Sequence, residues 1–203
     1  MIGIIDCGIG NVQSLYNFYL ENNIETQIIK STHQITDNIS KIILTGVSSF
    51  DEMMYLLDKK EFTVFIKNFV LNQNNKILGI CCGMQVLGNC SEEGNSEGLK
   101  LINGKNLLLE NKIKPHLGWN NIQLKQNEDH KIFKGLNNKD FFYFIHSYHF
   151  KNSDTSAKYL LTNYDNNNFI SFINKNNIYG VQFHPEKSHD TGKKILINFS
   201  RLT

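Results

Sequence analysis

The sequence predicts one α/β domain with a mostly parallel sheet, helices on both faces of that sheet, and a more antiparallel C-terminal half. In the first half, short apolar runs alternate with amphipathic stretches, which is typical of parallel strands joined by helices. In the second half, strand-like runs follow one another with few helical stretches between them. The 203 residues suffice to bury a core, so we expect a single domain over residues 1–203.

The elements expected in the first half follow from two patterns of apolar residues, one typical of buried strands and one typical of helices. Short, continuously apolar runs indicate strands that are buried on both faces. Apolar residues at the spacing of Leu15, Tyr16, Tyr19 and Leu20 indicate a helix. On these grounds we expect strands at Ile2–Ile5, Glu25–Ile29, Lys41–Leu44 and Lys76–Ile80, and helices at Val12–Leu20, Phe50–Leu57, Phe62–Leu71 and from Gly83 onward.

The second half is read in the same way and contains more strands than helices. A last amphipathic stretch, from about Gly192 to Leu202, is expected to be helical. The strand-like runs are Ile122–Leu124, Phe141–Ile145, Tyr159–Thr162, Phe169–Ile173 and Ile178–Phe183.

Charge and hydropathy exclude several classes of protein. Twenty-one basic and nineteen acidic residues give a formal net charge of +2, too weak and too dispersed to favour nucleic acid as a partner. The chain has no apolar run of the roughly 18 residues that a membrane span needs. No basic region precedes the apolar start MIGIIDCGIG, so we do not expect a signal peptide there.

The four cysteines, Cys7, Cys81, Cys82 and Cys90, do not suggest a disulfide scaffold or a metal site. Four cysteines are few for a scaffold in a chain of this length, and adjacent cysteines rarely bond to each other. Their spacing lacks the pair that zinc sites use. We therefore expect reduced thiols in a cytoplasmic protein without a metal.

The strongest local signal is the segment Leu78 to Gln85, which reads L-G-I-C-C-G-M-Q. A buried strand ends, a cysteine stands at the turn, and a helix begins, as in the nucleophile elbow G-x-C-x-G. The flanking Gly79 and Gly83 permit a sharp turn in which backbone approaches backbone. A helix N-terminus favours a thiolate, and the N–H group of Cys82 can face a developing oxyanion.

The motif is short, and a buried cysteine pair at a tight turn would produce it equally well. If the elbow is real, Cys81 is the nucleophile, because it stands between the two glycines. The side chain of Cys82 would then point elsewhere. Cys7 and Cys90 lack such surroundings and are expected to be packing residues.

A thiol nucleophile needs a base, and His184 is the best candidate among seven histidines. It follows the apolar run Ile178–Phe183, at the end of a strand where parallel sheets place their sites. Glu186 stands two residues further on, on the same side of an extended backbone, and can orient the imidazole. His146 is the rival base, without a carboxylate nearby in sequence. His33, His130 and His189 are expected at the surface.

Together, G-x-C-x-G-x-Q and the late F-H-P-E resemble the class I (triad) glutamine amidotransferases. Further segments are similar to glutaminase subunits of imidazole glycerol phosphate synthase, from the start of the chain to the last helix. The matching segments read I-I-D-C-G-I-G-N from Ile4, P-H-L-G-W-N from Pro115, Y-F-I-H-S-Y from Tyr143 and F-H-P-E-K-S from Phe183.

This resemblance implies a flavodoxin-like doubly wound sheet and a glutaminase. Cys81 would attack the carboxamide of glutamine and form a glutamyl thioester, and His184, oriented by Glu186, would transfer the protons. Gly46, Val47 and Cys82 would supply the oxyanion hole. Glutamine would be held by Gln85, Glu93, His146, Ser147 and Tyr148. No cofactor is implied.

The same resemblance implies a partner. Ammonia would pass to a (β/α)₈-barrel cyclase subunit, in a heterodimer that makes imidazole glycerol phosphate and an aminoimidazole nucleotide. No synthase domain is expected on this chain itself. The residues that match the partner interface are Asn11, Trp119, Tyr143 and Lys187. For Trp119, ordinary core packing would explain the residue equally well.

One segment departs from the family pattern. The oxyanion strand reads P-G-V-G-A-F in the family and T-G-V-S-S-F here, from Thr45, which changes its stiffness and its allowed backbone angles. The departure puts the coupling to a partner in doubt, and Cys7 and Cys82 also replace the usual residues. Three alternatives remain open: the same glutaminase chemistry serving a surface-sugar amidotransferase, a non-catalytic binding subunit, and a cysteine peptidase.

Overall fold

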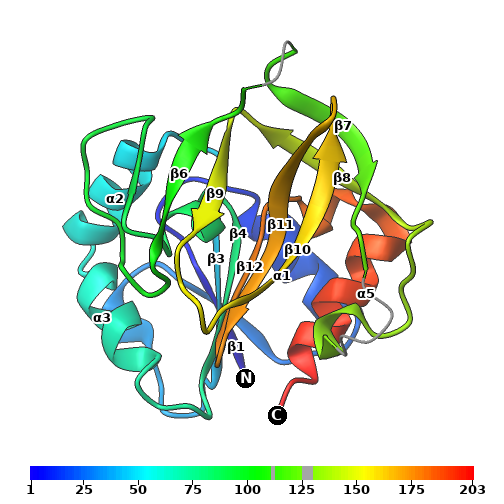
Figure 1. The fold of residues 1–203 in the computed structure, drawn as a ribbon. Helices are drawn as coiled ribbons and strands as arrows, with labels where there is room; N and C mark the ends of the chain where they lie inside the picture. The colour runs from blue at the N-terminus through cyan, green and yellow to red at the C-terminus, as the bar shows by residue number, and fades with distance from the viewer. Residues whose placement is uncertain (111–112, 125–129) are drawn as a thin grey trace.

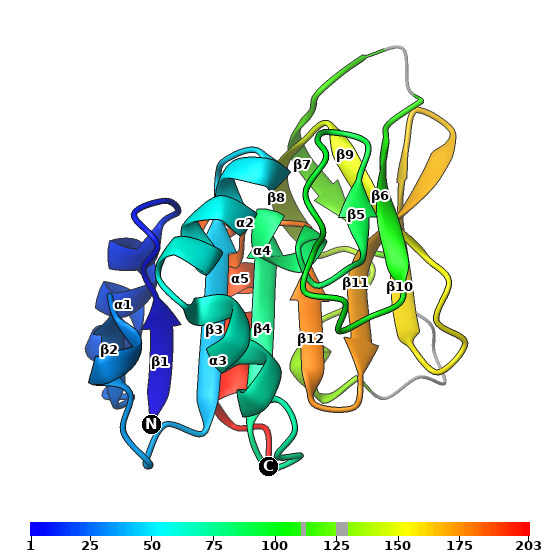
Figure 2. The same cartoon turned by 90° about the vertical axis from the view of Figure 1, so that its left-hand side faces the viewer.

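The structure is a computed structural model that describes residues 1–110, 113–124 and 130–203, and its centre is a seven-stranded sheet. Five parallel strands follow the order β2-β1-β3-β4-β12, and the antiparallel strands β11 and β10 extend this sheet at one edge (Figure 2). This is the flavodoxin-like strand order, and it confirms the predicted fold class. The strands are β1 Ile2–Ile5, β2 Thr26–Ile29, β3 Lys41–Gly46, β4 Lys76–Cys81, β10 Lys158–Tyr164, β11 Asn167–Lys175 and β12 Ile178–Val181.

Helices cover both faces of the sheet (Figure 1). On one face lie α1 (Val12–Glu21) and α5 (His189–Ser200), and on the other lie α2 (Phe50–Lys59) and α3 (Phe62–Phe69). Within the described ranges, no helix combines the length and the apolar character that a membrane crossing requires.

Two hydrophobic layers result, one on each side of the central strands. Ile4 and Ile43 belong to the layer under α1 and α5, whereas their neighbours Ile5 and Ile42 belong to the layer under α2 and α3. Successive residues of a strand point to opposite faces, so a strand that is covered on both sides must be apolar throughout. This explains the continuous apolar runs in the sequence.

The C-terminal half adds two small sheets that the sequence analysis anticipated only in part. Strands β5 (Cys90–Ser91), β6 (Gly104–Leu108) and β9 (Tyr148–Asn152) form one sheet, and β7 (His116–Asn121) pairs with β8 (Phe141–His146) in the other. Three short 3-10 helices complete the described elements: η1 Thr32–Gln34, η2 Lys131–Phe133 and η3 Pro185–Lys187.

Two predicted elements need correction. The expected strand Ile122–Leu124 is wrong, because the pairing of β7 with β8 ends at Asn121 and only a single bridge, at Gln123, follows. The side chain of Ile122 is buried, so its apolar character reflects packing and not a strand. The helix expected from Gly83 is the single turn α4 (Cys82–Gln85). It stops because the carbonyls of residues 86–88 accept hydrogen bonds from the segment 99–102.

Candidate active site

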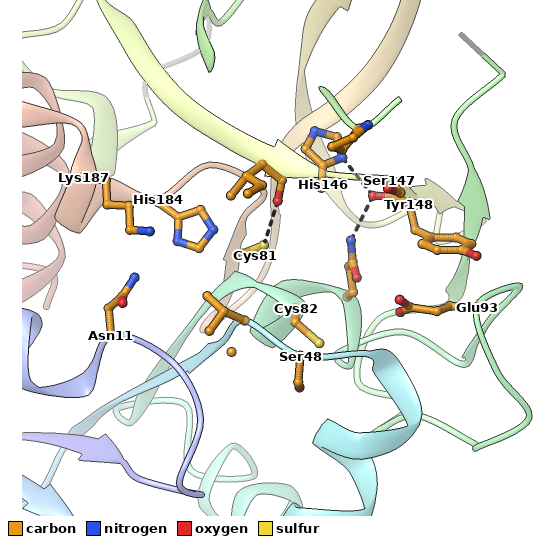
Figure 3. Close-up of a pocket in the computed structure, with 15 residues that line it drawn as sticks. Asn11, Ser48, Cys81, Cys82, Glu93, His146, Ser147, Tyr148, His184 and Lys187 are labelled. Atoms are coloured by element: carbon orange, nitrogen blue, oxygen red, sulfur yellow. Dashed lines mark hydrogen bonds between the residues drawn. The ribbon is translucent and has the colours of Figure 1, made fainter. Parts of the chain in front are cut away.

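A pocket of about 410 Å³ opens where β3, β4 and β12 end. In doubly wound sheets this carboxyl edge is where ligands bind. Cys81, His184 and Glu93 are among its lining residues, although they come from distant parts of the chain (Figure 3). All the residues that the sequence analysis predicted to catalyse the reaction or to bind glutamine line this pocket, apart from Glu186.

Cys81 stands at a strained turn between β4 and α4. Its φ of 56° and ψ of −113° are unusual for a residue other than glycine, and such strain is tolerated mainly at functional sites. The turn is closely packed, since a Cβ on Gly83 would collide with the carbonyl of Leu44, and one on Gly79 with the backbone of Gly83. These contacts explain why glycines flank the turn.

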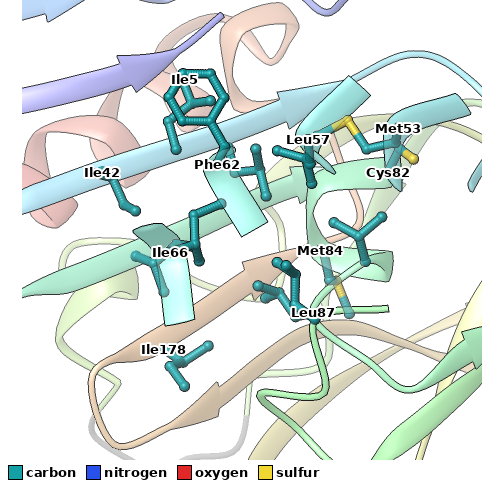
Figure 4. Packing of buried hydrophobic residues seen from close by; sticks show 14 of the residues in the cluster. Ile5, Ile42, Met53, Leu57, Phe62, Ile66, Cys82, Met84, Leu87 and Ile178 are labelled. Carbon is teal, nitrogen blue, oxygen red and sulfur yellow. The ribbon is translucent and has the colours of Figure 1, made fainter. Parts of the chain in front are cut away.

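The two adjacent cysteines have different surroundings. The Sγ atom of Cys81 lies 3.8 Å from the carbonyl oxygen of Ile145 and 3.8 Å from Nε2 of Gln182. The thiol of Cys82 points instead into the hydrophobic layer near Met53 (Figure 4), and burial raises its pKa well above the usual value. The geometry therefore presents Cys81, and not Cys82, as the available thiol.

His184 and Glu186 form a buried pair beside Cys81. The Nδ1 atom of His184 lies 2.8 Å from Oε1 of Glu186, and their side chains are 0% and 1% exposed. Burial alone would lower the pKa of His184, but the facing Cys81 and Glu186 outweigh it and raise the pKa to about 10. Burial would likewise raise the pKa of Glu186, and hydrogen bonds from His184 and Asn11 bring it below its usual value.

The Nε2 edge of the His184 imidazole lies on the side of the pocket that holds Cys81 (Figure 3). The buried Nε2 atom of His184 has no hydrogen-bond partner among the described residues, so this nitrogen is available for proton transfer. The backbone of His184 is fixed, because its N–H group donates to the carbonyl of Tyr143 at 2.9 Å. Ser188 donates to the His184 carbonyl at 2.6 Å and accepts from the Tyr143 N–H group at 3.0 Å.

The rival base His146 has both ring nitrogens engaged. Its Nδ1 lies 2.9 Å from the carbonyl of Tyr148, and its Nε2 lies 3.2 Å from Nδ1 of His116. Burial lowers the pKa of His146 to about 3 and that of His116 to about 4. A neutral histidine that donates at Nδ1 and accepts at Nε2 has no free nitrogen for a thiol proton, which favours His184 as the base.

The expected oxyanion residues meet at the ends of two neighbouring strands. Gly46 ends β3 and pairs with Cys81 at the end of β4, and Gly46, Val47 and Cys82 all line the pocket. Thr45, which replaces the proline of the family pattern, is buried, and its hydroxyl has no hydrogen-bond partner within the described residues.

Polar side chains close the far side of the pocket. Glu93 lines it and accepts a hydrogen bond from the N–H group of Phe50 at 2.8 Å. Gln85 donates to the carbonyl of Tyr148 at 2.9 Å, so its amide fixes the backbone of the segment that carries Ser147 and Tyr148. This side of the pocket can therefore hold a small zwitterion.

The four expected interface residues divide into two groups. Trp119 is 46% exposed, stacks on His189 with ring centroids 5.0 Å apart, and contacts Tyr143 edge-on. The ammonium of Lys187 lies 5.9 Å from the centre of the Tyr143 ring, at the pocket. Trp119 is thus outside the core. Asn11 differs, because its side chain points inward to Glu186 (2.7 Å).

The sequence profile of a family described as glutamine amidotransferase class-I matches residues 3–202. The chain belongs to this family.

Proteins similar to this amidotransferase chain include subunits of one synthase. The chain is 41% identical to imidazole glycerol phosphate synthase subunit HisH 2 of Methanococcus maripaludis, over 98% of each chain. It is 37% identical to the subunit HisH of Leptospira interrogans, over 100% of each chain. Its fold is similar to the solved structure of PurLQS from Thermotoga maritima, with a TM-score of 0.72 and 17% identity over 98% of this chain and 96% of that one.

Two residues around the pocket of this amidotransferase were missed in the sequence. Gln182 is fully buried and contacts both Gln85, at 3.2 Å, and Cys81. A lone polar residue inside the apolar run Ile178–Phe183 was the available signal. Asp51 accepts hydrogen bonds from the backbone N–H groups of Asn95 and Ser96, and thereby holds the loop that carries Glu93. No periodic pattern marks it.

Proposed function

We propose that this chain is the glutaminase subunit of an imidazole glycerol phosphate synthase, in histidine biosynthesis. It would hydrolyse glutamine to glutamate and supply the ammonia to a partner. The observation that carries the proposal is the strained Cys81, which shares a pocket with His184, a histidine bonded to the buried Glu186. The relatives that match this chain over almost their full length carry that subunit name.

The proposed chemistry starts with proton transfer from the thiol of Cys81 to Nε2 of His184. The raised pKa of His184 favours this transfer, and Glu186 stabilises the imidazolium that forms. The thiolate then attacks the carboxamide carbon of glutamine, and the C–N bond breaks as His184 returns the proton to the leaving ammonia. Water next attacks the glutamyl thioester, with His184 as base, and releases glutamate and the free thiol.

The negative charge of each tetrahedral intermediate needs donors at the end of β3. We assign this role to the backbone N–H groups of Gly46, Val47 and Cys82, three residues that line the pocket. Donors arranged in advance around a developing oxyanion supply a large part of the rate enhancement in acyl transfer.

Substrate binding is assigned to the polar side of the pocket. The carboxylate of Glu93 suits the ammonium group of glutamine, and the segment from His146 to Tyr148 suits its carboxylate, with Gln85 holding that segment in place. Small zwitterions are selected by such convergent polar groups.

We propose that the partner, a (β/α)₈-barrel cyclase subunit, covers the rim of the pocket and forms a heterodimer with this chain. Val47 and Ile145 line the pocket and are exposed by 53% and 40%. Leu117 and Trp119, which pair with Ile145 and Tyr143 across β7 and β8, are exposed by 58% and 46%. Exposed aromatic side chains such as Trp119 are typical of interface centres. We also infer a cytoplasmic location, because the four cysteines are free.

The departure at Thr45 favours one second candidate. The hydroxyl of Thr45 is buried without a partner in the described part of the chain, at the strand that carries the oxyanion donors. A partner other than the histidine-pathway cyclase, in a surface-sugar amidotransferase, would use the same glutaminase chemistry with a differently shaped oxyanion loop.

Complementation separates the two candidates. The chain should restore growth without histidine to a strain that lacks its own glutaminase subunit. The Cys81→Ala variant should fail to do so, because its nucleophile is removed. Cys90→Ala should succeed, because Cys90 lies outside the pocket and is exposed, which corrects the prediction that it is a packing residue. Failure of the wild-type chain despite soluble expression would favour the surface-sugar candidate, and growth with Cys81→Ala would contradict the mechanism.

A further inference from the structure

Asn11 reaches into the active site from the opposite end of the sequence. Its Nδ2 donates to Oε1 of Glu186 at 2.7 Å, across 175 residues of chain. The same oxygen lies 2.8 Å from Nδ1 of His184. The second oxygen of the carboxylate, Oε2, is buried and has no hydrogen-bond partner in residues 1–110, 113–124 and 130–203. The orientation of this carboxylate therefore depends on the two donors that share Oε1.

The backbone around Asn11 aims its amide at Glu186. Asn11 precedes the first residue of α1, where asparagine is favoured because its side chain caps the helix. Here the side chain makes no cap hydrogen bond, and it bonds to Glu186 instead. Gly10, with a φ of 93°, is pressed against the backbone of Thr45, so that a Cβ there would collide with the Thr45 carbonyl. The loop that carries Asn11 is thus braced against the end of β3.

We propose that Asn11 is a positioning residue of the active site: its amide fixes the carboxylate of Glu186, which in turn holds His184 in place to receive the proton of Cys81. This inference rests on the proposed triad and deepens it. Asn11 acts on His184 only through Glu186 and does not itself touch the reacting atoms, so we assign it no proton-transfer step.

The proposal gives Asn11 a role within this chain, which is distinct from a role in partner binding. Without the amide, Oε1 loses one of its two side-chain donors and keeps the hydrogen bond from His184, so the orientation of the carboxylate is less firmly fixed. An aspartate at this place would bring a second carboxyl group against Glu186, and two carboxyl groups this close share one proton, so the negative charge that faces His184 is divided between them. In either case the imidazolium of His184 loses stabilisation.

The test is the pH profile of alkylation of Cys81 by iodoacetamide, measured on the full chain alone. Only the thiolate reacts, so the profile reports how well His184 and Glu186 stabilise the thiolate–imidazolium pair. The Cys81 peptide is followed by mass spectrometry, and the Cys81→Ala variant gives the background from Cys82 on the same peptide. The variants are Asn11→Leu, similar in size without a donor, and Asn11→Asp, nearly identical in shape.

Both variants should shift the profile to higher pH, with a rate at pH 6 lower by about tenfold, the effect of one pKa unit. The control is Gln13→Ala, on the same helix, which removes an exposed hydrogen bond to Asn17 and should keep the wild-type profile. Asn11→Asp keeps the shape of the side chain, so the test stands even where Asn11→Leu does not fold.

A second control separates this inference from the proposed function. His184→Asn should shift the profile at least as far as the Asn11 variants. If it does not, the proposed triad itself fails. If His184→Asn shifts the profile and folded Asn11 variants keep the wild-type profile, the triad stands and the inference about Asn11 is overturned, leaving the residue to partner binding.

Discussion

At the scale of single residues, the buried neutral histidines His116 and His146 make the stability of the fold depend on pH. Both side chains are buried, and their folded pKa values of about 4 and about 3 lie below the ordinary 6.5. Between these values the unfolded chain binds more protons than the folded chain. Stability is therefore fully present above pH 6.5 and declines as the pH falls below it.

We predict that His116→Phe weakens this pH dependence. Phenylalanine keeps the stacking of His116 on Phe144 and Tyr164 but cannot take up a proton. Between pH 7 and pH 5, the variant should lose less unfolding free energy than the wild type, by on the order of 2 kcal/mol, the linkage of one histidine. Urea unfolding at the two pH values measures this, and comparing the two chains cancels the contributions of other groups. Equal losses in both chains would show that folding does not lower the pKa of His116, which would contradict this account.

The residue scale also marks the limit of sequence reasoning. Cys81, His184 and Glu186 stand in short motifs whose spacing encodes a turn and a strand end, so their chemistry was predictable. The contact of Asn11 with Glu186 joins positions 175 residues apart, and the His116–His146 contact joins two different strands. No periodicity records such contacts, because they depend on how the strands are ordered in the sheet.

At the scale of elements, the elbow between β4 and α4 depends on close approach of backbones. The carbonyl of Leu44 in β3 occupies the space where a Cβ on Gly83 would lie. This approach brings the end of β3, with Gly46, next to Cys81. The packing of this turn therefore holds Cys81, the proposed nucleophile, beside the expected oxyanion donors.

We predict that Gly83→Ala destabilises the fold by about 3 kcal/mol, the upper range for overpacking, and abolishes glutaminase activity. The matched control is Gly135→Ala, at a φ of 79° in open space, which carries only the strain of that backbone angle, about 1 to 2 kcal/mol. It should keep its activity. Urea unfolding and glutamate release measure both effects. An active, stable Gly83→Ala chain would mean that β3 and α4 can move apart.

The strands themselves were predictable to different degrees. β1, β3 and β4 are buried on both faces, so their apolar runs are continuous and easily recognised. β6, β7 and β9 carry polar residues on one side, as in Gly104–Leu108 and His116–Asn121, and their short stretches did not stand out. The predicted strand Ile122–Leu124 rests on apolar residues, and the burial of Ile122 explains its apolar side chain without a strand.

At the scale of the whole molecule, the strand order explains why the site lies where it does. β4 is flanked by β3 and β12, so three parallel strands bring Cys81, Gly46 and His184 to one edge. These are the residues that we propose as nucleophile, oxyanion donor and base. The small sheets β7–β8 and β5–β6–β9 lie beside this edge and contribute His146 and Tyr148 to the pocket, and the turn after β5 contributes Glu93 (Figures 2 and 3). The expectation that residues 1–203 form one domain stays a prediction.

The most direct measurement of the central claim is detection of the acyl-enzyme. The chain, assembled with the proposed cyclase subunit and glutamine, is quenched in acid, digested and examined by mass spectrometry. The account predicts a glutamyl group on the peptide that carries Cys81, absent from the Cys81→Ala variant and present in Cys90→Ala. Steady release of glutamate without a glutamyl adduct, or with undiminished rate in Cys81→Ala, would contradict it.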